Sequence, residues 1–338
     1  MTFFDENHSN GGDGAPEPAE LPSVHASVEP AAPLFADAPI GDPFSYGATH
    51  PQPYALAAAP KSDLEVPWSW GHLLLFILFG VVSFVLVQSA FITYYILTKR
   101  LSTHPAQKEF QQFAYSTPFF AVGSMVVWYA LLFLFFFITL SSYYHAPFWE
   151  SLGWRRLNPE NRKVPRSGWI YFLLGCGMSF VVMAVTATVK APEHAPIQDM
   201  LKNRTMAFAF MGMAVLVAPL VEETLFRGYL YPVFTRIISA ILRFCGMAAS
   251  QATNTGVFSS IVLTGVLFGL MHGYQLGWSK AIVAALIGVG IVLTIVRSRA
   301  ETTLASFLMH LGYNSVIAFL GTIGLIFAKY AKLPPPHP

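Results

Sequence analysis

Long apolar runs without a charged side chain constrain the fold of this sequence more than any other feature. The run from Gly71 to Thr98 contains no Asp, Glu, Lys or Arg, and the same holds for residues 113–140 and 168–189. A helix needs about 20 residues to cross a hydrocarbon layer of about 30 Å. Each run is therefore predicted to span a bilayer, and the chain is predicted to be a polytopic membrane protein.

The second half of the sequence contains five further apolar segments. They cover residues 205–221, 228–242, 256–271, 281–296 and 302–327. Segment 228–242 is short and interrupted by Arg236, so it is predicted to be a tilted span or an interfacial helix. The predicted fold class is all-α, a polytopic bundle of about eight transmembrane or membrane-embedded helices. The composition, 54% hydrophobic and only 11% charged, is too apolar for an ordinary soluble domain.

The first 66 residues have a different composition. They are rich in Pro, Ala, Gly and Asp, and residues 1–60 hold eight acidic side chains and no Lys or Arg. Such a segment buries too little apolar surface to fold and is predicted to be a disordered tail. It has no basic stretch of the kind that starts a signal peptide. The predicted organisation is a tail, a membrane domain with a catalytic core, and a short C-terminal tail, at residues 1–66, 67–330 (core about 168–328) and 331–338.

One loop carries the densest group of basic residues. It follows the interfacial, Trp-containing segment 148–154 and contains Arg155, Arg156, Arg162, Lys163 and Arg166. The positive-inside rule places this loop in the cytoplasm, and the N-terminus, two spans earlier, on the same side. The prediction is an integral membrane protein, in the plasma membrane if bacterial, with the lipid bilayer as its surroundings. Nothing indicates nucleic-acid binding, because the basic residues flank membrane segments.

The segment Pro219–Arg227 places ionisable groups where a membrane helix is predicted. Each such group costs roughly 2.5–3.5 kcal/mol on insertion, so it usually faces a cavity or a partner. Residues four apart share a helix face, so Glu223 is predicted to pair with Arg227. Glu222 points elsewhere and is predicted to be the carboxylate free for chemistry. Pro219 removes a backbone hydrogen bond and predicts a kink beside the site.

Three more polar residues lie within late apolar runs. His310 and Asn314 are four residues apart and share a helix face. His272 directly follows the apolar run 256–271. A stripe of small residues, Gly265, Gly269 and Gly273, predicts close approach of another helix.

These side chains permit two mechanisms of hydrolysis. In the first, His272 and His310 bind a divalent metal, zinc by preference, with Glu222 or Glu223 as a further ligand. In the second, Glu222 alone activates water, and the second histidine and Asn314 stabilise the oxyanion. A lone membrane histidine is more often a hydrogen-bonded core residue, and Glu223–Arg227 also suits a structural pair. The functional hypothesis therefore depends on the conjunction of these residues.

The sequence resembles the CPBP family of intramembrane metalloproteases, which includes the type II CAAX prenyl endopeptidases and the Abi bacteriocin-immunity proteins. The motifs that carry the resemblance are Glu222-Glu223-Thr224-Leu225-Phe226-Arg227, Phe268-Gly269-Leu270-Met271-His272 and His310-Leu311-Gly312-Tyr313-Asn314. The resemblance implies a helical membrane enzyme with a polar cavity open to the cytoplasm. It implies that Glu222 activates water, that His272 and His310 are ligands or transition-state stabilisers, and that Glu223, Arg227 and Asn314 organise the site.

The predicted function is an intramembrane endopeptidase acting on a membrane-associated or lipidated protein, such as a prenylated CAAX-type substrate. Two alternatives use the same residues differently. The first is a catalytically silent immunity or scaffold protein. The second is an ion-coupled transporter, because buried Glu and His also form relays; no matching discontinuous helices in two halves support it.

Overall fold

The computed structural model describes residues 64, 66–158, 160–161, 163–189 and 195–330, and the elements within them are helices. The predicted all-α fold class is confirmed. The predicted disordered tail lies outside the described residues except for Leu64 and Val66, and the predicted C-terminal tail lies wholly outside them.

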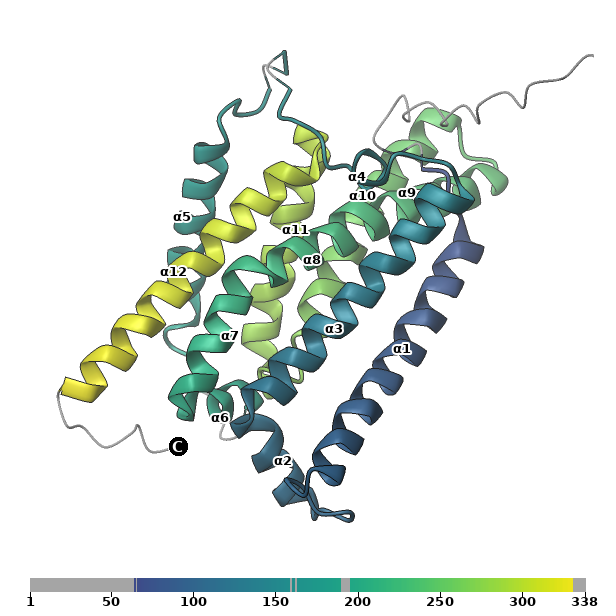
Figure 1. Cartoon of the computed structure of the whole chain (residues 1–338). Coiled ribbons are helices and arrows are strands. Elements are labelled where there is room, and N and C mark those ends of the chain that lie inside the picture. Colours follow the sequence, from purple (N-terminus) through teal and green to yellow (C-terminus); the bar gives the residue numbers. More distant parts are fainter. Residues whose placement is uncertain (1–63, 65, 159, 162, 190–194, 331–338) are drawn as a thin grey trace, which may run out of the picture. The chain divides into compact units, whose positions relative to one another are not determined.

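The elements follow one another along the chain as shown in Figure 1. Their bounds are α1 (Trp70–Leu97), α2 (Gln107–Ser116), α3 (Pro118–Phe137), η1 (Ile138–Tyr143), α4 (Phe148–Ser151), α5 (Gly168–Thr186), α6 (Pro196–Lys202), α7 (Arg204–Leu216), α8 (Ala218–Glu223), η2 (Thr224–Leu230), α9 (Tyr231–Phe244), α10 (Ala249–Met271), α11 (Lys280–Ala300) and α12 (Thr303–Tyr330). The elements η1 and η2 are π-helical.

Seven helical stretches among the described residues are long and apolar enough to cross a membrane. The fourth and fifth predicted runs form a single stretch, Arg204–Phe244, because the helix continues through the acidic motif. The motif looks like a break in hydropathy, but the bundle buries Glu223 and Arg227 completely. The helical pattern is interrupted at Val217, just before Pro219, where the sequence predicts a kink.

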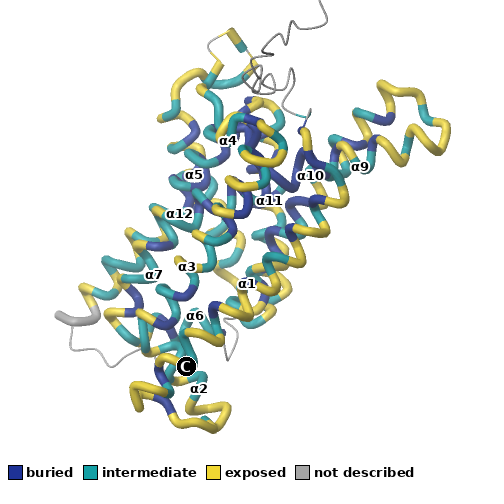
Figure 2. Tube along the Cα trace, turned by 45° about the vertical axis from the view of Figure 1, so that its right-hand side comes forward, coloured by how far each residue is buried: buried dark blue, intermediate teal, exposed yellow. Residues whose placement is uncertain are grey.

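The outer faces of the bundle are covered by apolar side chains. On α1, for example, Leu78, Val85 and Leu86 are all more than half exposed. Figure 2 shows exposed residues along the length of this helix. A soluble monomer rarely exposes so much contiguous apolar surface, so these faces fit contact with lipid.

Val66, which the sequence analysis assigns to the tail, and Trp68 both pack against the membrane domain. Val66 and Trp68 are buried, and Arg236 of α9 donates hydrogen bonds to their backbone carbonyls at 2.8 and 2.7 Å. The indole of Trp68 stacks on Tyr229 at a ring separation of 5.4 Å. Arg236, which interrupts an apolar run in the sequence, thus anchors the segment before α1.

The glycine residues of α10 allow α11 to pack closely against it. A Cβ on Gly265 or Gly269 would lie 2.7 Å from the backbone nitrogen of Ile291 or Ile287. Figure 1 shows the two helices side by side. The sequence analysis predicts close approach of another helix here, which is expected to bring His272 towards its partners. The helix that packs there carries none of Glu222, His310 or Asn314, so the effect on His272 is indirect.

The helices α5 and α12 also approach through glycine. A Cβ on Gly312 would collide with the Phe172 carbonyl oxygen, whereas a Cβ on Gly324 of the same helix meets nothing within 4 Å. Gly312→Ala is expected to destabilise the protein by about 1–3 kcal/mol through overpacking. Gly324→Ala is the matched control and is expected to raise the stability slightly, because alanine favours helix over glycine. Thermal unfolding in detergent measures both, and equal midpoints for the two variants would contradict the prediction.

Candidate active site

The acidic motif forms a buried ion pair, as the spacing predicts. Arg227 Nη1 donates to Glu223 Oε1 at 2.8 Å, and both side chains are 0% exposed. Glu223 ends α8 and Arg227 lies in the π-helical η2. A charge this deeply buried needs a partner, because desolvation of a lone ion costs several kcal/mol. The pair therefore permits two charges to lie inside the bundle.

The guanidinium of Arg227 has further partners on two other helices. Its Nη2 donates to the Gly290 carbonyl at 2.9 Å, and its Nε donates to Thr294 Oγ1 at 3.3 Å. Its Cζ lies 4.5 Å from the ring centroid of Phe268, a cation–π contact. Helices α10 and α11 thus hold Arg227, and through it Glu223, in a fixed place.

His310 is held in one tautomer by Glu223. Its Nδ1 lies 2.9 Å from Glu223 Oε1, which also accepts from Arg227. An ionised carboxylate only accepts hydrogen bonds, so Nδ1 carries the hydrogen. In the neutral ring Nε2 is then an acceptor, and it lies 3.8 Å from Glu222 Oε2.

His272, the residue after α10, is oriented by its own helix. Its Nδ1 lies 2.7 Å from the backbone oxygen of Phe268, which only accepts, so this nitrogen also carries the hydrogen. Its Nε2 lies 3.8 Å from Glu222 Oε1. Each imidazole therefore directs its unprotonated Nε2 at a different oxygen of the Glu222 carboxylate.

Glu222 differs from the adjacent Glu223 in both its hydrogen bonding and its exposure. Among the described residues its carboxylate makes no hydrogen bond, the two imidazole nitrogens lie 3.8 Å away, and its side chain is 17% exposed. The side chain of His272 is 24% exposed, whereas that of His310 is only 3% exposed. Glu222 and His272 are therefore partly open at the surface of the bundle, and the ion pair lies behind them.

Asn314 is anchored by a carbonyl group of α7. Its Nδ2 donates to the Ala214 oxygen at 2.7 Å and lies 3.3 Å from His310 Nε2. The contact with a carbonyl fixes the orientation of the amide, because only nitrogen donates. A primary amide has two hydrogens, so Asn314 contacts both groups at once and supports the His310 ring.

The structure thus brings together all six residues singled out in the sequence: Glu222, Glu223, Arg227, His272, His310 and Asn314. The sequence analysis missed Phe268, Gly290 and Thr294 as supporting groups. Arg227 has five donor hydrogens, more than Glu223 can accept, which indicates acceptors on another helix. That count does not say which helix supplies them.

The donor types of the site, imidazole and carboxylate, suit zinc. Among the described residues, no group of three or more His, Cys, Asp or Glu side chains is placed to hold an ion. His310 Nε2 lies against the Asn314 amide, and Glu223 Oε1 already accepts from two donors. Zinc binding stays a prediction.

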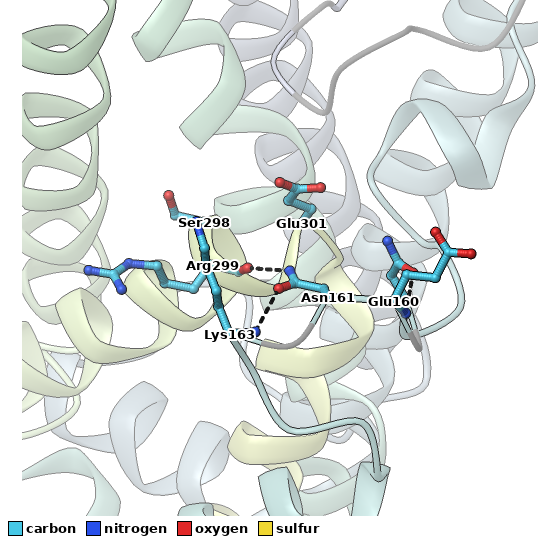
Figure 3. Close-up of a pocket in the computed structure, with 7 residues that line it drawn as sticks. Glu160, Asn161, Lys163, Ser298, Arg299 and Glu301 are labelled. Carbon is cyan, nitrogen blue, oxygen red and sulfur yellow. Dashed lines mark hydrogen bonds between the residues drawn. The ribbon is translucent and has the colours of Figure 1, made fainter. Parts of the chain in front are cut away.

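A separate open pocket lies at the turn between α11 and α12. Figure 3 shows Asn161 there, whose side-chain nitrogen donates to the Arg299 backbone oxygen at 3.2 Å. None of the six site residues lines this pocket. The lining residues are Asn158, Glu160, Asn161, Lys163, Ser298, Arg299 and Glu301.

The region that contains the six site residues matches a known family. The matching family model is described as type II CAAX prenyl endopeptidase Rce1-like and covers residues 204–316. The matched stretch is called the Rce1-like domain below. The match agrees with the resemblance to the CPBP family. No curated protein matches the chain. No solved structure matches it either.

The Rce1-like domain runs from the start of α7 to the middle of α12. The family is one of intramembrane CAAX-type endopeptidases, so the match supports a hydrolase of this kind. Together with the seven apolar helices, it identifies the chain as an integral membrane protein.

Proposed function

We propose that this protein is an intramembrane endopeptidase in which Glu222 activates water to cleave a peptide bond. The single observation that carries the proposal is the contrast between the two adjacent glutamates. Glu223 is fully buried and paired, while Glu222 is partly exposed and faces two imidazole acceptors. A general base must be free of a permanent partner and reachable by its substrate, and Glu222 alone of the two meets these conditions.

The 3.8 Å separations fit a water molecule as the shared partner. A water donates one hydrogen to a Glu222 oxygen and the other to His272 Nε2, which leaves its lone pairs directed at a substrate carbonyl. Glu222 takes the proton as the water oxygen bonds to the carbonyl carbon, and the C=O electron pair moves onto oxygen. Glu222 then returns that proton to the amide nitrogen as the C–N bond breaks, releasing an acid and an amine.

The oxyanion of this intermediate needs a hydrogen-bond donor. Asn314 supplies such a donor, because the hydrogen that it directs at His310 Nε2 spans the long distance of 3.3 Å and is the more weakly held of its two amide hydrogens. The other hydrogen stays on the Ala214 carbonyl and keeps the amide oriented. In this proposal Asn314 exchanges His310 for the oxyanion during the reaction.

The substrate class follows from the position of the site. The catalytic side chains lie in, or directly after, helices long and apolar enough to span a membrane, so the scissile bond must enter the bundle from the membrane or its interface. A segment next to a lipid anchor is delivered to that depth by its own partitioning. We therefore propose prenylated CAAX-type or other membrane-associated proteins as substrates.

The test is cleavage of a farnesylated CAAX peptide by the full-length protein in lipid vesicles, followed by mass spectrometry. The same peptide without the prenyl group measures the contribution of the anchor. The expected result is release of a C-terminal fragment from the prenylated peptide in a reaction that depends on Glu222. Binding without cleavage would overturn the proposal and favour a catalytically silent scaffold.

The proposed steps use side chains only, so chelation is expected to leave the cleavage rate unchanged. Initial rates are compared before and after EDTA treatment, with the metal content of the purified protein measured in parallel. Loss of activity together with one equivalent of zinc, and absence of that zinc in His272→Ala, would instead support the metal mechanism.

A further inference from the structure

A short segment outside the Rce1-like domain is bonded to the helix that carries His310. This segment, Leu152–Arg155, is called the strap below. Thr303 at the start of α12 donates from its backbone nitrogen to the Gly153 oxygen at 2.8 Å and from Oγ1 to the Leu152 oxygen at 2.9 Å. Thr302 Oγ1 donates to the Arg155 oxygen at 2.6 Å. The strap is therefore fixed to the first turn of α12.

The other side of the strap contacts η2, the π-helical turn that follows the glutamates. Trp154 Nε1 donates to Thr224 Oγ1 at 3.1 Å, and Thr224 Oγ1 donates to the Leu220 oxygen at 2.7 Å. One turn later, Gly228 approaches so closely that a Cβ there would lie 2.5 Å from the Leu152 oxygen. The strap thus contacts both the beginning and the middle of η2.

The backbone of the strap is itself tightly constrained. Gly153 has φ +73°, and a Cβ there would lie 2.5 Å from Arg297 Nη2 and 2.8 Å from Thr303 Oγ1. Further along the same loop, Asn161 donates to the Arg299 backbone oxygen, as Figure 3 shows. The loop is therefore fixed at several points to the end of α11 and the start of α12.

A π-helical turn needs such support, because it is rare and its hydrogen bonds span one residue more than those of an α-helix. If η2 relaxed to α-helix, one residue would leave the turn. The helix before it would then rotate by about 100° relative to the helix after it. Glu222 would turn away from the two imidazoles, and misplacement by about 1 Å already costs roughly 100-fold in rate.

We propose that Trp154 is a positioning residue: its indole N–H, bonded to Thr224, holds η2 in the register that directs Glu222 at His272 and His310. The sequence analysis assigns Trp154 to an interfacial Trp belt. Only Trp149 fits that assignment, with a side chain 50% exposed, whereas Trp154 is partly buried between η2 and Phe307 of α12. The catalytic part of this inference rests on the proposed function, and the structural part does not.

The experiment compares Trp154→Phe with Trp149→Phe in the full-length protein. Trp149 is the matched control because its ring also contacts Trp154, at 6.0 Å, but among the described residues its indole has no hydrogen-bond partner. Hydrogen exchange of the backbone amides of residues 218–231 is measured in lipid nanodiscs by mass spectrometry. Trp154→Phe is expected to speed exchange in this segment at least about tenfold, and Trp149→Phe is expected to leave it unchanged.

Peptide cleavage gives a second readout. Trp154→Phe is expected to lower kcat about tenfold or more with little change in KM. Thr224→Val should have the same effect, and the double variant should lose no more than either single variant. Thr224→Ser, which keeps the hydroxyl, should restore most of kcat. Because Thr224→Val nearly keeps the size of the side chain, it also serves if Trp154→Phe fails to fold.

The possible outcomes separate the two proposals. Unchanged exchange in both Trp154→Phe and Thr224→Val would overturn the positioning role, even if cleavage depends on Glu222. If the wild-type protein shows no Glu222-dependent cleavage, the proposed function fails, and the exchange comparison still decides whether Trp154 supports η2.

Discussion

Glu222→Gln is expected to lower kcat for peptide cleavage by at least about 100-fold while the protein stays folded. Glutamine has nearly the same size and fits the same space, but its amide cannot accept a proton from water at neutral pH. The side chain of Glu222 is partly exposed and makes no ion pair with Arg227, so its replacement removes little structure. The measurement is the rate of fragment release at saturating prenylated peptide.

The control for this variant is Glu150→Gln. Glu150 lies on the short helix α4 at the surface and takes no part in the site. Cleavage by the control should match the wild type, and both variants should unfold at the wild-type temperature. Cleavage by Glu222→Gln at the wild-type rate would remove the basis for the proposed mechanism, because no other accessible carboxylate lies beside the two imidazoles in the described part of the chain.

Arg227→Met is expected to destabilise the protein by about 3–5 kcal/mol and to abolish cleavage. The substitution leaves the Glu223 carboxylate buried at 0% exposure without its cation, and it also leaves the Gly290 carbonyl without its donor. Arg299→Met is the control, because that side chain is exposed at the turn between α11 and α12. Thermal unfolding in detergent should separate the two variants clearly.

A double variant distinguishes loss of stability from loss of chemistry. Glu223→Leu combined with Arg227→Met removes both buried charges, so much of the lost stability is expected to return. Cleavage should not return, because His310 Nδ1 then lacks the acceptor that fixes its tautomer. A double variant as unstable as Arg227→Met alone would show that the ion pair is not what the single variant disrupts.

The membrane character and the core of the site follow from the sequence because their causes are local. Charge-free runs of about 20 residues require lipid whatever their neighbours are. The pairing of Glu223 with Arg227 is a relation within one helical segment, and the same geometry leaves Glu222 on another face. His310 and Asn314 share a helix face for the same reason.

The contacts that give these residues distinct environments come from elsewhere in the chain. Gly290 and Thr294 hold Arg227 from 63 and 67 residues away, and Trp154 contacts Thr224 across 70 residues. No local period predicts which helix faces which. The stripe of Gly265 and Gly269 predicts a close neighbour correctly without showing that α11 fills the place.

The sequence also does not predict that the fourth and fifth apolar runs join into one helical stretch. Hydropathy falls at the acidic motif, and the sequence by itself determines that charged groups lie there. Only the tertiary structure decides that the helix continues through them as a π-helical turn, because α10, α11, α12 and the strap supply partners for groups that one helix in lipid cannot satisfy alone. The residue types and their order thus set what chemistry is available, and the packing of distant helices decides which glutamate is free to perform it.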